Sequence, residues 1–245
     1  MGAAAAGAVA AVRRPPMLLA AASQLATRVN FHVPKGACDC HTHIFGDLQR
    51  YPMVPSRGYT PEAASVDEMR ALHRALHVDR VVIVQPSVYG ADNSGLLDAL
   101  RQLGPRARGV AVIDDQTSDA ALAGMDHAGV RGIRINLATA GQSDPAAARQ
   151  RFQAAVERIK GRRWHIQIYA QLPVIAAVKD QVMASPVPVV FDHFGAAQAA
   201  LGLAQPGFDA LLDMVRTSLN VLGNCLATVV IARWEGEFDD RKASA

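Results

Sequence analysis

The sequence predicts an α/β protein in which short parallel strands alternate with longer helices. After Pro34, short apolar runs rich in Val and Ile alternate with segments whose apolar residues recur at helical spacing. Such alternation is typical of βα units that build a parallel sheet. The chain of 245 residues is 50% hydrophobic and 19% charged, which is enough to bury the core of one large domain.

Six apolar runs are predicted as strands and six amphipathic segments as helices. The predicted strands are residues 37–44, 80–85, 108–113, 132–137, 164–169 and 188–193. The predicted helices are residues 66–77, 94–103, 118–128, 145–160, 172–184 and 208–216. Local signals support the helix ends: Ser65 and Glu68 have capping-box spacing, Asp144 precedes Pro145 as an N-cap would, and Gly161 follows a C-terminus.

The two ends of the chain differ in composition from its centre. Residues 1–34 are predicted to be a leader, either disordered or a signal peptide, in which Arg13 and Arg14 would precede the apolar stretch 17–26. Pro15 and Pro16 directly after the arginines count against a signal. We therefore expect a cytoplasmic protein, with a periplasmic location as the alternative. Residues 35–217 are predicted as one domain, and residues 218–245 as an atypical C-terminal segment.

Charge and cysteine content narrow the class of partner. The formal net charge is +3 and the 25 Lys and Arg residues are scattered, so we expect no nucleic-acid partner. No segment reaches the roughly 20 apolar residues of a membrane-spanning helix, so we expect no membrane partner. Cys38, Cys40 and Cys225 form no even disulfide framework. A small anionic molecule is the expected partner, and a homo-oligomer remains open.

The strand spacing allows an open doubly wound sheet or a closed barrel, and the first βα junction favours the barrel. A dinucleotide-binding fold would carry a glycine-rich turn there, whereas this chain places His41 and His43 at the strand end. Further polar residues end other strands, including Gln85, Asn136 and His193. A barrel collects its active site from such positions. The predicted fold is therefore a (β/α)8 barrel of the TIM type.

The histidine pair is the first candidate site. Residues two apart in a strand point to the same face, so His41 and His43 would both point into the barrel. Converging imidazoles can bind a metal ion or a substrate oxyanion. The pair alone is equally compatible with ordinary core or surface histidines, and a third histidine, His193, after the sixth predicted strand strengthens the functional interpretation.

Polar residues after other strands are candidates for substrate binding. Ser87, Tyr89 and Asn93 follow the second predicted strand, although an ordinary turn would use the same residue types. Arg134 shares a strand face with Asn136, so its guanidinium would point into the barrel. An anionic substrate is the expected counter-ion, and a salt bridge to an inward Asp or Glu is the alternative. On the fifth strand, Gln167 shares its face with His165 and Tyr169.

Six motifs combine into one family pattern: D-C-H-T-H-I-F at 39–45, R-G-Y-T-P at 57–61, V-Q-P-S-V-Y-G-A-D-N at 84–93, G-I-R-I-N at 132–136, H-I-Q at 165–167 and D-H-F-G at 192–195. Over residues 35–216 the chain resembles the amidohydrolase superfamily (amidohydrolase-related, family 2). The string at 84–93 makes the resemblance specific to the branch of 2-pyrone-4,6-dicarboxylate lactonase and sugar-lactone hydrolases.

The resemblance implies a hydrolase that opens a lactone, the cyclic ester of a carboxylated small molecule. It assigns His41, His43 and His193 to catalysis, because the matching histidines polarise the carbonyl and stabilise the tetrahedral oxyanion. It assigns Tyr59, Ser87 and Arg134 to the substrate carboxylates. It implies no cofactor, with a single Zn²⁺ on the three histidines as the alternative.

The chain departs from the family pattern near its C-terminus. The family's general base is an aspartate in a G-x-D-W-P-H segment after the eighth strand, and this sequence has no such segment. We therefore expect an incomplete barrel of about six or seven strands, with 226–231 as a possible seventh, a frameshift or truncation after about residue 217, and impaired activity. A metal-dependent amidohydrolase or decarboxylase and a non-catalytic carboxylate-binding remnant are the alternative functions.

Overall fold

The computed structural model describes residues 29–214, except residues 140 and 142. Most of the predicted leader, the predicted C-terminal segment 218–245 and the possible strand 226–231 lie outside the described residues. The predictions for these segments therefore stay predictions.

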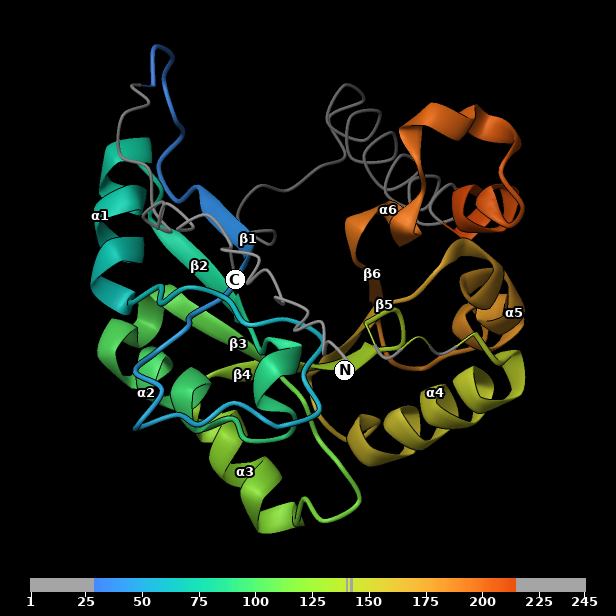
Figure 1. Cartoon of the computed structure of the whole chain (residues 1–245), viewed down its shortest axis with the longest axis horizontal. Coiled ribbons are helices and arrows are strands. Elements are labelled where there is room, and N and C mark those ends of the chain that lie inside the picture. The colour runs from blue at the N-terminus through green and yellow to red at the C-terminus, as the bar shows by residue number, and fades with distance from the viewer. Residues whose placement is uncertain (1–28, 140, 142, 215–245) are drawn as a thin grey trace, which may run out of the picture.

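Six strands form one parallel sheet in chain order. They are β1 (Cys38–Thr42), β2 (Arg80–Val84), β3 (Ala107–Ala111), β4 (Val130–Asn136), β5 (His165–Tyr169) and β6 (Val189–Phe191). The sheet curls so that β1 and β6 lie on opposite sides of its concave face (Figure 1). This curled half-barrel confirms the predicted fold class and its incomplete strand set, since each of β1 and β6 has one strand neighbour among the described residues.

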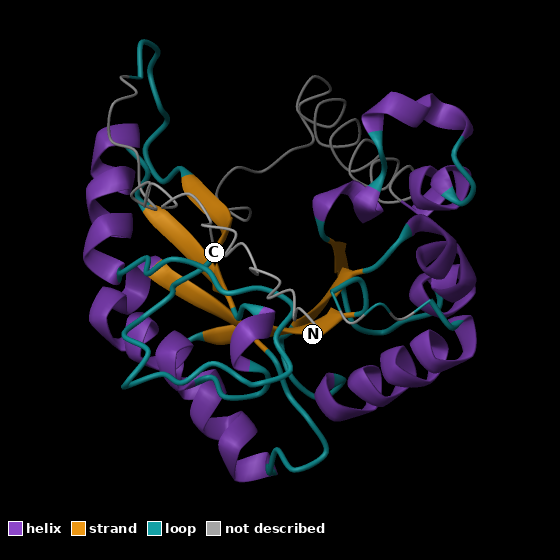
Figure 2. Ribbon diagram, viewed as in Figure 1, coloured by secondary structure: helices purple, strands orange, loops and turns teal. Residues whose placement is uncertain are grey.

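The helices cover the outer side of the sheet, as Figure 2 shows. They are α1 (Val66–Leu76), α2 (Ser94–Leu103), α3 (Asp119–Ala128), α4 (Pro145–Ile159), α5 (Leu172–Met183) and the short α6 (His193–Ala196). Three 3-10 turns, η1 (Ser87–Tyr89), η2 (Gly104–Arg106) and η3 (Ala199–Ala204), connect them. Residues 208–214, within the last predicted helix, are helical. Apolar side chains of helices and strands pack into one core between these layers.

The capping signals act as the sequence predicts. The Ser65 hydroxyl accepts from the Glu68 N–H at 3.2 Å, and the Glu68 carboxylate accepts from the Ser65 N–H at 2.7 Å. The Asp144 carboxylate accepts from the Ala146 N–H at 2.9 Å, with Pro145 at the first helical position. These bonds satisfy amide groups that have no partner inside the helix.

Strand β6 stops at Phe191, two residues before its predicted end, and β1 and β3 also end two residues early. His193 and Phe194 take positive φ values of 50° and 51°, a left-handed conformation that ends the extended chain. The Phe194 side chain is 85% exposed, and Val190 on the preceding strand is 46% exposed. The β6 edge therefore presents apolar surface, as expected for an incomplete barrel.

Gly132 on β4 is required by close packing rather than by a turn. A Cβ at this position would lie 2.5 Å from the His165 ring on β5. Burial lowers the pKa of His165, so the ring packs there in its neutral form. Because His165 is the first residue of β5, it lies at the opposite end of that strand from the strand-end polar residues.

None of the helices in the described part of the chain combines the length and the apolar character that crossing a bilayer requires.

Candidate active site

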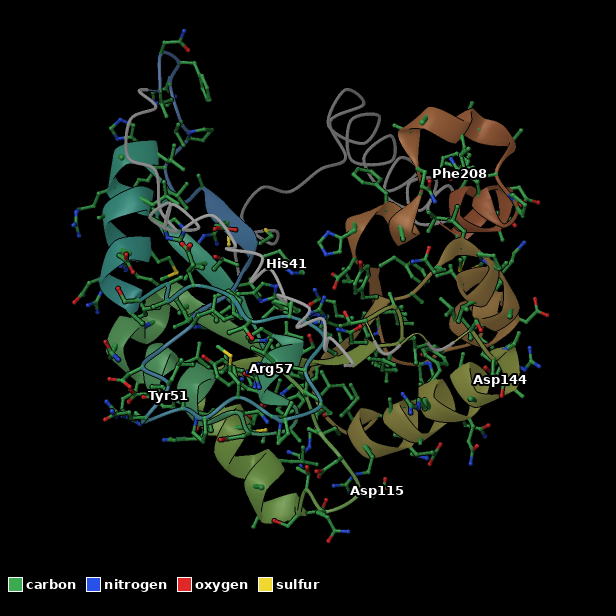
Figure 3. The ribbon with its side chains drawn as sticks, viewed as in Figure 1. His41, Tyr51, Arg57, Asp115, Asp144 and Phe208 are labelled. Atoms are coloured by element: carbon green, nitrogen blue, oxygen red, sulfur yellow. The ribbon has the colours of Figure 1, made fainter. Side chains whose placement is uncertain are left out.

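The three predicted histidines meet on the inner side of the curved sheet, where Figure 3 labels His41. The rings of His41 and His43 have centroids 5.1 Å apart, and those of His41 and His193 are 5.4 Å apart. His41 lies within β1, while His193 follows β6 after one intervening residue. The curl of the sheet therefore brings together side chains that are far apart in sequence.

His43 is fixed in a neutral form. Its Nδ1 lies 2.7 Å from the carbonyl oxygen of Val84, so Nδ1–H donates to that oxygen and Nε2 is left with a lone pair. Burial lowers the pKa of His43 to about 4, with the nearby Arg134 charge adding to the effect. A neutral imidazole with a free Nε2 can accept a proton or bind a metal ion.

Asp192 is the centre of the buried polar network. Its carboxylate accepts from the Arg134 Nη2 at 3.0 Å and forms a short hydrogen bond with the Gln167 side-chain amide. The same carboxylate lies 3.4 Å from Nδ1 of His41, and the Gln167 amide nitrogen lies 3.1 Å from that Nδ1. Asp192 and Gln167 therefore orient His41 from the side away from its Nε2.

The network keeps Asp192 ionised. Burial acts to raise its pKa, but the hydrogen bonds from His41 and Gln167 and the charge of Arg134 outweigh that effect, so the pKa lies below its usual range. The side chains of Asp192 and Arg134 are 2% and 5% exposed. A buried carboxylate with three polar neighbours is typical of an organised functional site.

Arg134 has an ion-pair partner inside the protein, and its predicted contact with an anionic substrate stays a prediction. An anionic substrate was expected, whereas the guanidinium already pairs with Asp192, which was the alternative. The register of β4 with β5 and of β5 with β6 brings Asp192 beside Arg134. The sequence does not reveal strand register, so it could not show which of the two partners Arg134 would meet. The Arg134 Nε is buried without a hydrogen-bond acceptor, so one donor remains available.

Tyr169 joins this cluster although sequence reasoning gave it no role. The Arg134 guanidinium carbon lies 5.5 Å from the Tyr169 ring centroid, and the His193 ring centroid lies 4.9 Å from it. The signal for Tyr169 was its shared strand face with Gln167, and the signal for Asp192 was the D-H-F-G motif. Neither signal shows which neighbours the side chain will meet.

Two predicted substrate-binding amides are used by the protein itself. The Asn93 side chain donates to the carbonyls of Ala91 and Val112 at 2.9 and 2.8 Å and accepts from the Val112 N–H at 3.0 Å. The Asn136 side chain exchanges two hydrogen bonds with Thr139, at 3.1 and 3.0 Å. Asn93 therefore links the loop after β2 to the end of β3, and contact with a substrate would require these bonds to open.

The remaining predicted contacts lie on loops near the site. Ser87 and Tyr89 form the turn η1 after β2, where Tyr89 is buried and burial raises its pKa. Tyr59 is 43% exposed on the loop between β1 and α1. Among the described residues, no hydrogen bond joins these three side chains to the histidines, so their roles stay predictions.

One set of side chains fits a metal ion by type and spacing. His41, Asp192 and His193 each offer one ligand atom, and these atoms lie within 4.8 Å of one another. Two imidazoles and a carboxylate are suitable ligands for Zn²⁺. This set differs from the predicted alternative of three histidines, because Asp192 takes the place of His43. A bound divalent ion would supply a Lewis acid at this position.

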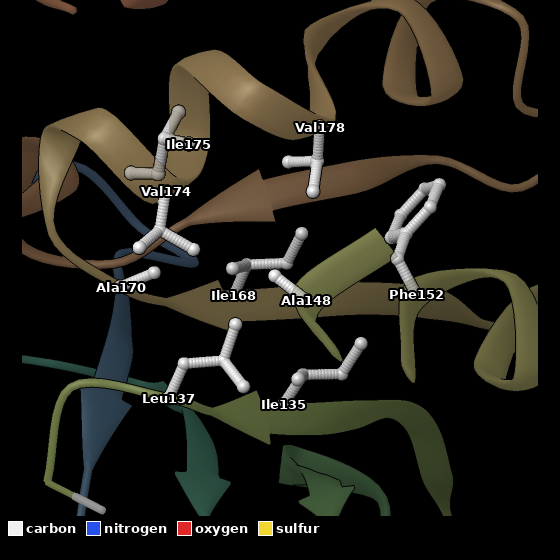
Figure 4. Close-up of a pocket in the computed structure, with 9 residues that line it drawn as sticks. All are labelled: Ile135, Leu137, Ala148, Phe152, Ile168, Ala170, Val174, Ile175 and Val178. Carbon is white, nitrogen blue, oxygen red and sulfur yellow. The ribbon is translucent and has the colours of Figure 1, made fainter. Parts of the chain in front are cut away.

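A cavity elsewhere in the molecule is not a second site. It lies between α4, α5 and strands β4 and β5, is lined by apolar side chains such as Ile135, Phe152 and Ile168, and has a volume of about 10 Å³ (Figure 4). A space of this size holds at most about one water molecule, and its apolar lining favours a dry gap. The histidine cluster is therefore the candidate active site.

Curated proteins are similar to this chain over most of its length. The chain is 34% identical over 195 residues to a 2-pyrone-4,6-dicarboxylate hydrolase of Comamonas testosteroni, covering 80% of this chain and 63% of the relative. It is 29% identical over 186 residues to a 4-sulfomuconolactone hydrolase of Rhizobium radiobacter, covering 76% and 62%. The chain thus spans less than two thirds of the length of these curated relatives.

A solved structure shares the fold. The probable 2-pyrone-4,6-dicarboxylic acid hydrolase from Acinetobacter baumannii, solved with citric acid bound, has a TM-score of 0.65 and 25% identity, covering 73% of this chain and 66% of that one. A separate, short similarity is to the proton/glutamate-aspartate symporter of Escherichia coli, 62% identical over 39 residues or 16% of this chain. A stretch of that length shows no second family.

The family model described as Amidohydrolase matches residues 38–243. The match begins at the first residue of β1, includes every strand of the sheet and all three histidines, and continues past residue 216, where the resemblance found from the sequence ends. The resemblance that the sequence motifs indicated is therefore confirmed: this chain belongs to the amidohydrolase family.

Proposed function

We propose that this protein hydrolyses a carboxylated lactone, so that water adds to the ester carbonyl and the ring C–O bond breaks to give a carboxylate and a hydroxyl group. The observation that carries the proposal is the buried Nε2 of His41, which has no hydrogen-bond partner. An unpartnered buried nitrogen is costly unless a ligand completes it. The relatives that are named lactone hydrolases support the reaction class.

In this proposal His41 and His193 bind and polarise the carbonyl oxygen, whereas the lone pair on His43 Nε2 is available to accept a proton. Asp192 and Gln167 lie beside His41 Nδ1, so they hold the ring with its Nε2 toward the ligand. His193 lies on the other side of His41, and its ring contacts Tyr169. Preoriented donors stabilise the developing oxyanion without reorganisation during the reaction.

The same cluster also provides a contact for the negative charge of the substrate. The free Nε of Arg134 provides a donor for a substrate carboxylate, while Nη2 stays on Asp192. Ser87 and Tyr59 are proposed as further carboxylate contacts through the family resemblance. The proposed partner is thus a small anionic molecule.

Water activation is the step for which this chain lacks the family's residue. The family's base is an aspartate in a G-x-D-W-P-H segment that this sequence does not contain. We therefore assign the activation of water to no residue of the given sequence.

A panel of carboxylated lactones tests the proposal, with ring opening followed by absorbance and proton release. His41→Asn should abolish turnover, whereas His127→Asn, at an exposed position on α3, should leave it unchanged. Equal turnover in wild type and His41→Asn would refute the assigned role. Absence of both turnover and saturable binding across the panel would refute the function.

A metal-dependent hydrolase is the second candidate, favoured by the spacing of His41, Asp192 and His193. Metal analysis of the purified protein and lactone assays with and without a chelator separate the two candidates. Stoichiometric Zn²⁺ together with chelator-sensitive turnover supports the second candidate, and chelator-resistant turnover supports the first.

A further inference from the structure

A polar groove lies at the opposite end of the sheet from the histidines. It has a volume of about 410 Å³, and its lining includes Lys35, Arg74, His77, Asp79 and Arg106. Lys35 precedes β1, Asp79 precedes β2 and Arg106 precedes β3, so the groove lies at the amino ends of these strands. The histidine cluster lies at the carboxyl ends of β1 and β6, so the two places are distinct.

The wall that carries Lys35 is fixed to the sheet. The carbonyl of Ala37 accepts from the N–H groups of Asp79 and Arg80, both at 3.0 Å. The Gly36 N–H donates to the Asp79 carboxylate at 2.6 Å, and the Arg80 Nε donates to the Gly36 carbonyl at 2.7 Å. The backbone next to Lys35 is therefore held in place before any ligand binds.

The facing wall is the C-terminus of α1. His77 has a left-handed conformation with φ 56°, and its N–H donates to the Arg74 carbonyl at 3.3 Å. The Val78 N–H donates to the His73 carbonyl at 2.9 Å. The helix end is therefore capped by its own backbone, as in other helices that end in a left-handed residue.

The charges in the groove are unbalanced. The side chains of Lys35, Arg74 and Arg106 have neither a hydrogen bond nor an ion pair among the described residues. The carboxylate of Asp79 is engaged by the Gly36 N–H. The helix dipole attracts a cation to the C-terminus of α1, which explains the position of Arg74. Lys35 and Arg106 lie outside α1, so the helix dipole does not explain their positions. Three cations from three segments thus face one groove.

We propose that this groove binds a small multivalent oxyanion, either a phosphate ester or a di- or tricarboxylate. Lys and Arg side chains donate charge-assisted hydrogen bonds to such anions, and an anion between the three cations relieves their mutual repulsion. The volume is in the range of small-molecule sites, about 300–1,000 Å³. The site is independent of the lactone-hydrolase proposal.

Calorimetric titration of the full chain with pyrophosphate, and separately with citrate, tests the proposal. We expect saturable binding with one equivalent per chain, and binding that weakens as NaCl is added. Preference for pyrophosphate identifies a phosphate ester as the ligand class, and preference for citrate identifies a polycarboxylate.

Matched arginine variants locate the binding. Arg106→Met should weaken binding about tenfold or more, because one charge-assisted contact is lost. Arg151→Met makes the same change in charge at an exposed position of α4 and should change binding less than about twofold. If Arg106→Met fails to fold, Arg74→Met is the replacement. Equal weakening by Arg106→Met and Arg151→Met, or no saturable binding to either anion, overturns the proposal.

Discussion

The buried pair of Arg134 and Asp192 gives the sharpest prediction about stability. Asp192→Asn removes the negative charge that faces the Arg134 guanidinium at 3.0 Å and leaves a cation in surroundings where the two side chains are 5% and 2% exposed. Removing one partner of such a pair costs about 3–5 kcal/mol, because the remaining charge is buried without compensation. We therefore expect the free energy of unfolding to fall by that amount.

A double variant separates the effect of the unpaired charge from simple loss of contacts. Arg134→Met combined with Asp192→Asn removes both charges, so it should recover at least about 2 kcal/mol relative to Asp192→Asn alone. Urea unfolding followed by circular dichroism measures the wild type, Asp192→Asn, Arg134→Met and the double variant. The reasoning is refuted if the double variant is as unstable as the sum of the single variants.

An exposed ion pair provides the matched control. The Lys160 ammonium lies 2.6 Å from the Glu157 carboxylate, at a shorter distance than in the buried pair, but both side chains are more than half exposed. Solvent screening leaves exposed pairs worth about 1 kcal/mol or less. Glu157→Gln should therefore change stability by less than about 1 kcal/mol, and a larger loss would show that distance rather than burial decides the cost.

Three further predictions address single features. The pKa of His43 is about 4 in the folded chain, against an ordinary value of 6.5. Between these values the unfolded chain binds one more proton than the folded chain, so the free energy of unfolding falls by up to about 3 kcal/mol as the pH drops from about 6.5 to 4. Urea unfolding at pH 7 and pH 4.5 should show a smaller fall in this free energy for His43→Asn than for the wild type. Ser65→Ala should lower the melting temperature, since loss of an N-cap costs about 1 kcal/mol, and an unchanged melting temperature would contradict the capping role. Gly132→Ala should cost about 1–3 kcal/mol in urea unfolding, because the new methyl group would meet the His165 ring, and His165→Ala in the same chain should relieve part of that cost.

The general order of elements was predictable because its signals are local. The five longer helices begin within one residue of their predicted starts, and five of the six strands begin within one residue. Capping by Ser65 and Asp144 depends on neighbours within three residues, so it can be inferred without knowing the fold. Strands β1, β3 and β6 end two residues before their predicted ends, and at β6 the left-handed conformations of His193 and Phe194 end the strand.

The catalytic candidates were predictable for a different reason. Alternation along a strand and the position of strand ends placed His41, His43 and His193 on the inner side of a barrel. Their convergence follows once the sheet curls, as the ring distances show. The family motifs reached the same residues.

The sequence by itself determined the parallel α/β architecture, the helix caps and the strand-end histidines, because periodicity and capping are properties of neighbouring residues. Only the tertiary structure decided that Asp192 pairs with Arg134 and that Asn93 bonds to the backbone of Val112, directly after β3. It also decided that Lys35 and Arg106 share a groove. These contacts join residues far apart in the chain, and they depend on strand register and sheet curvature, which no local pattern encodes.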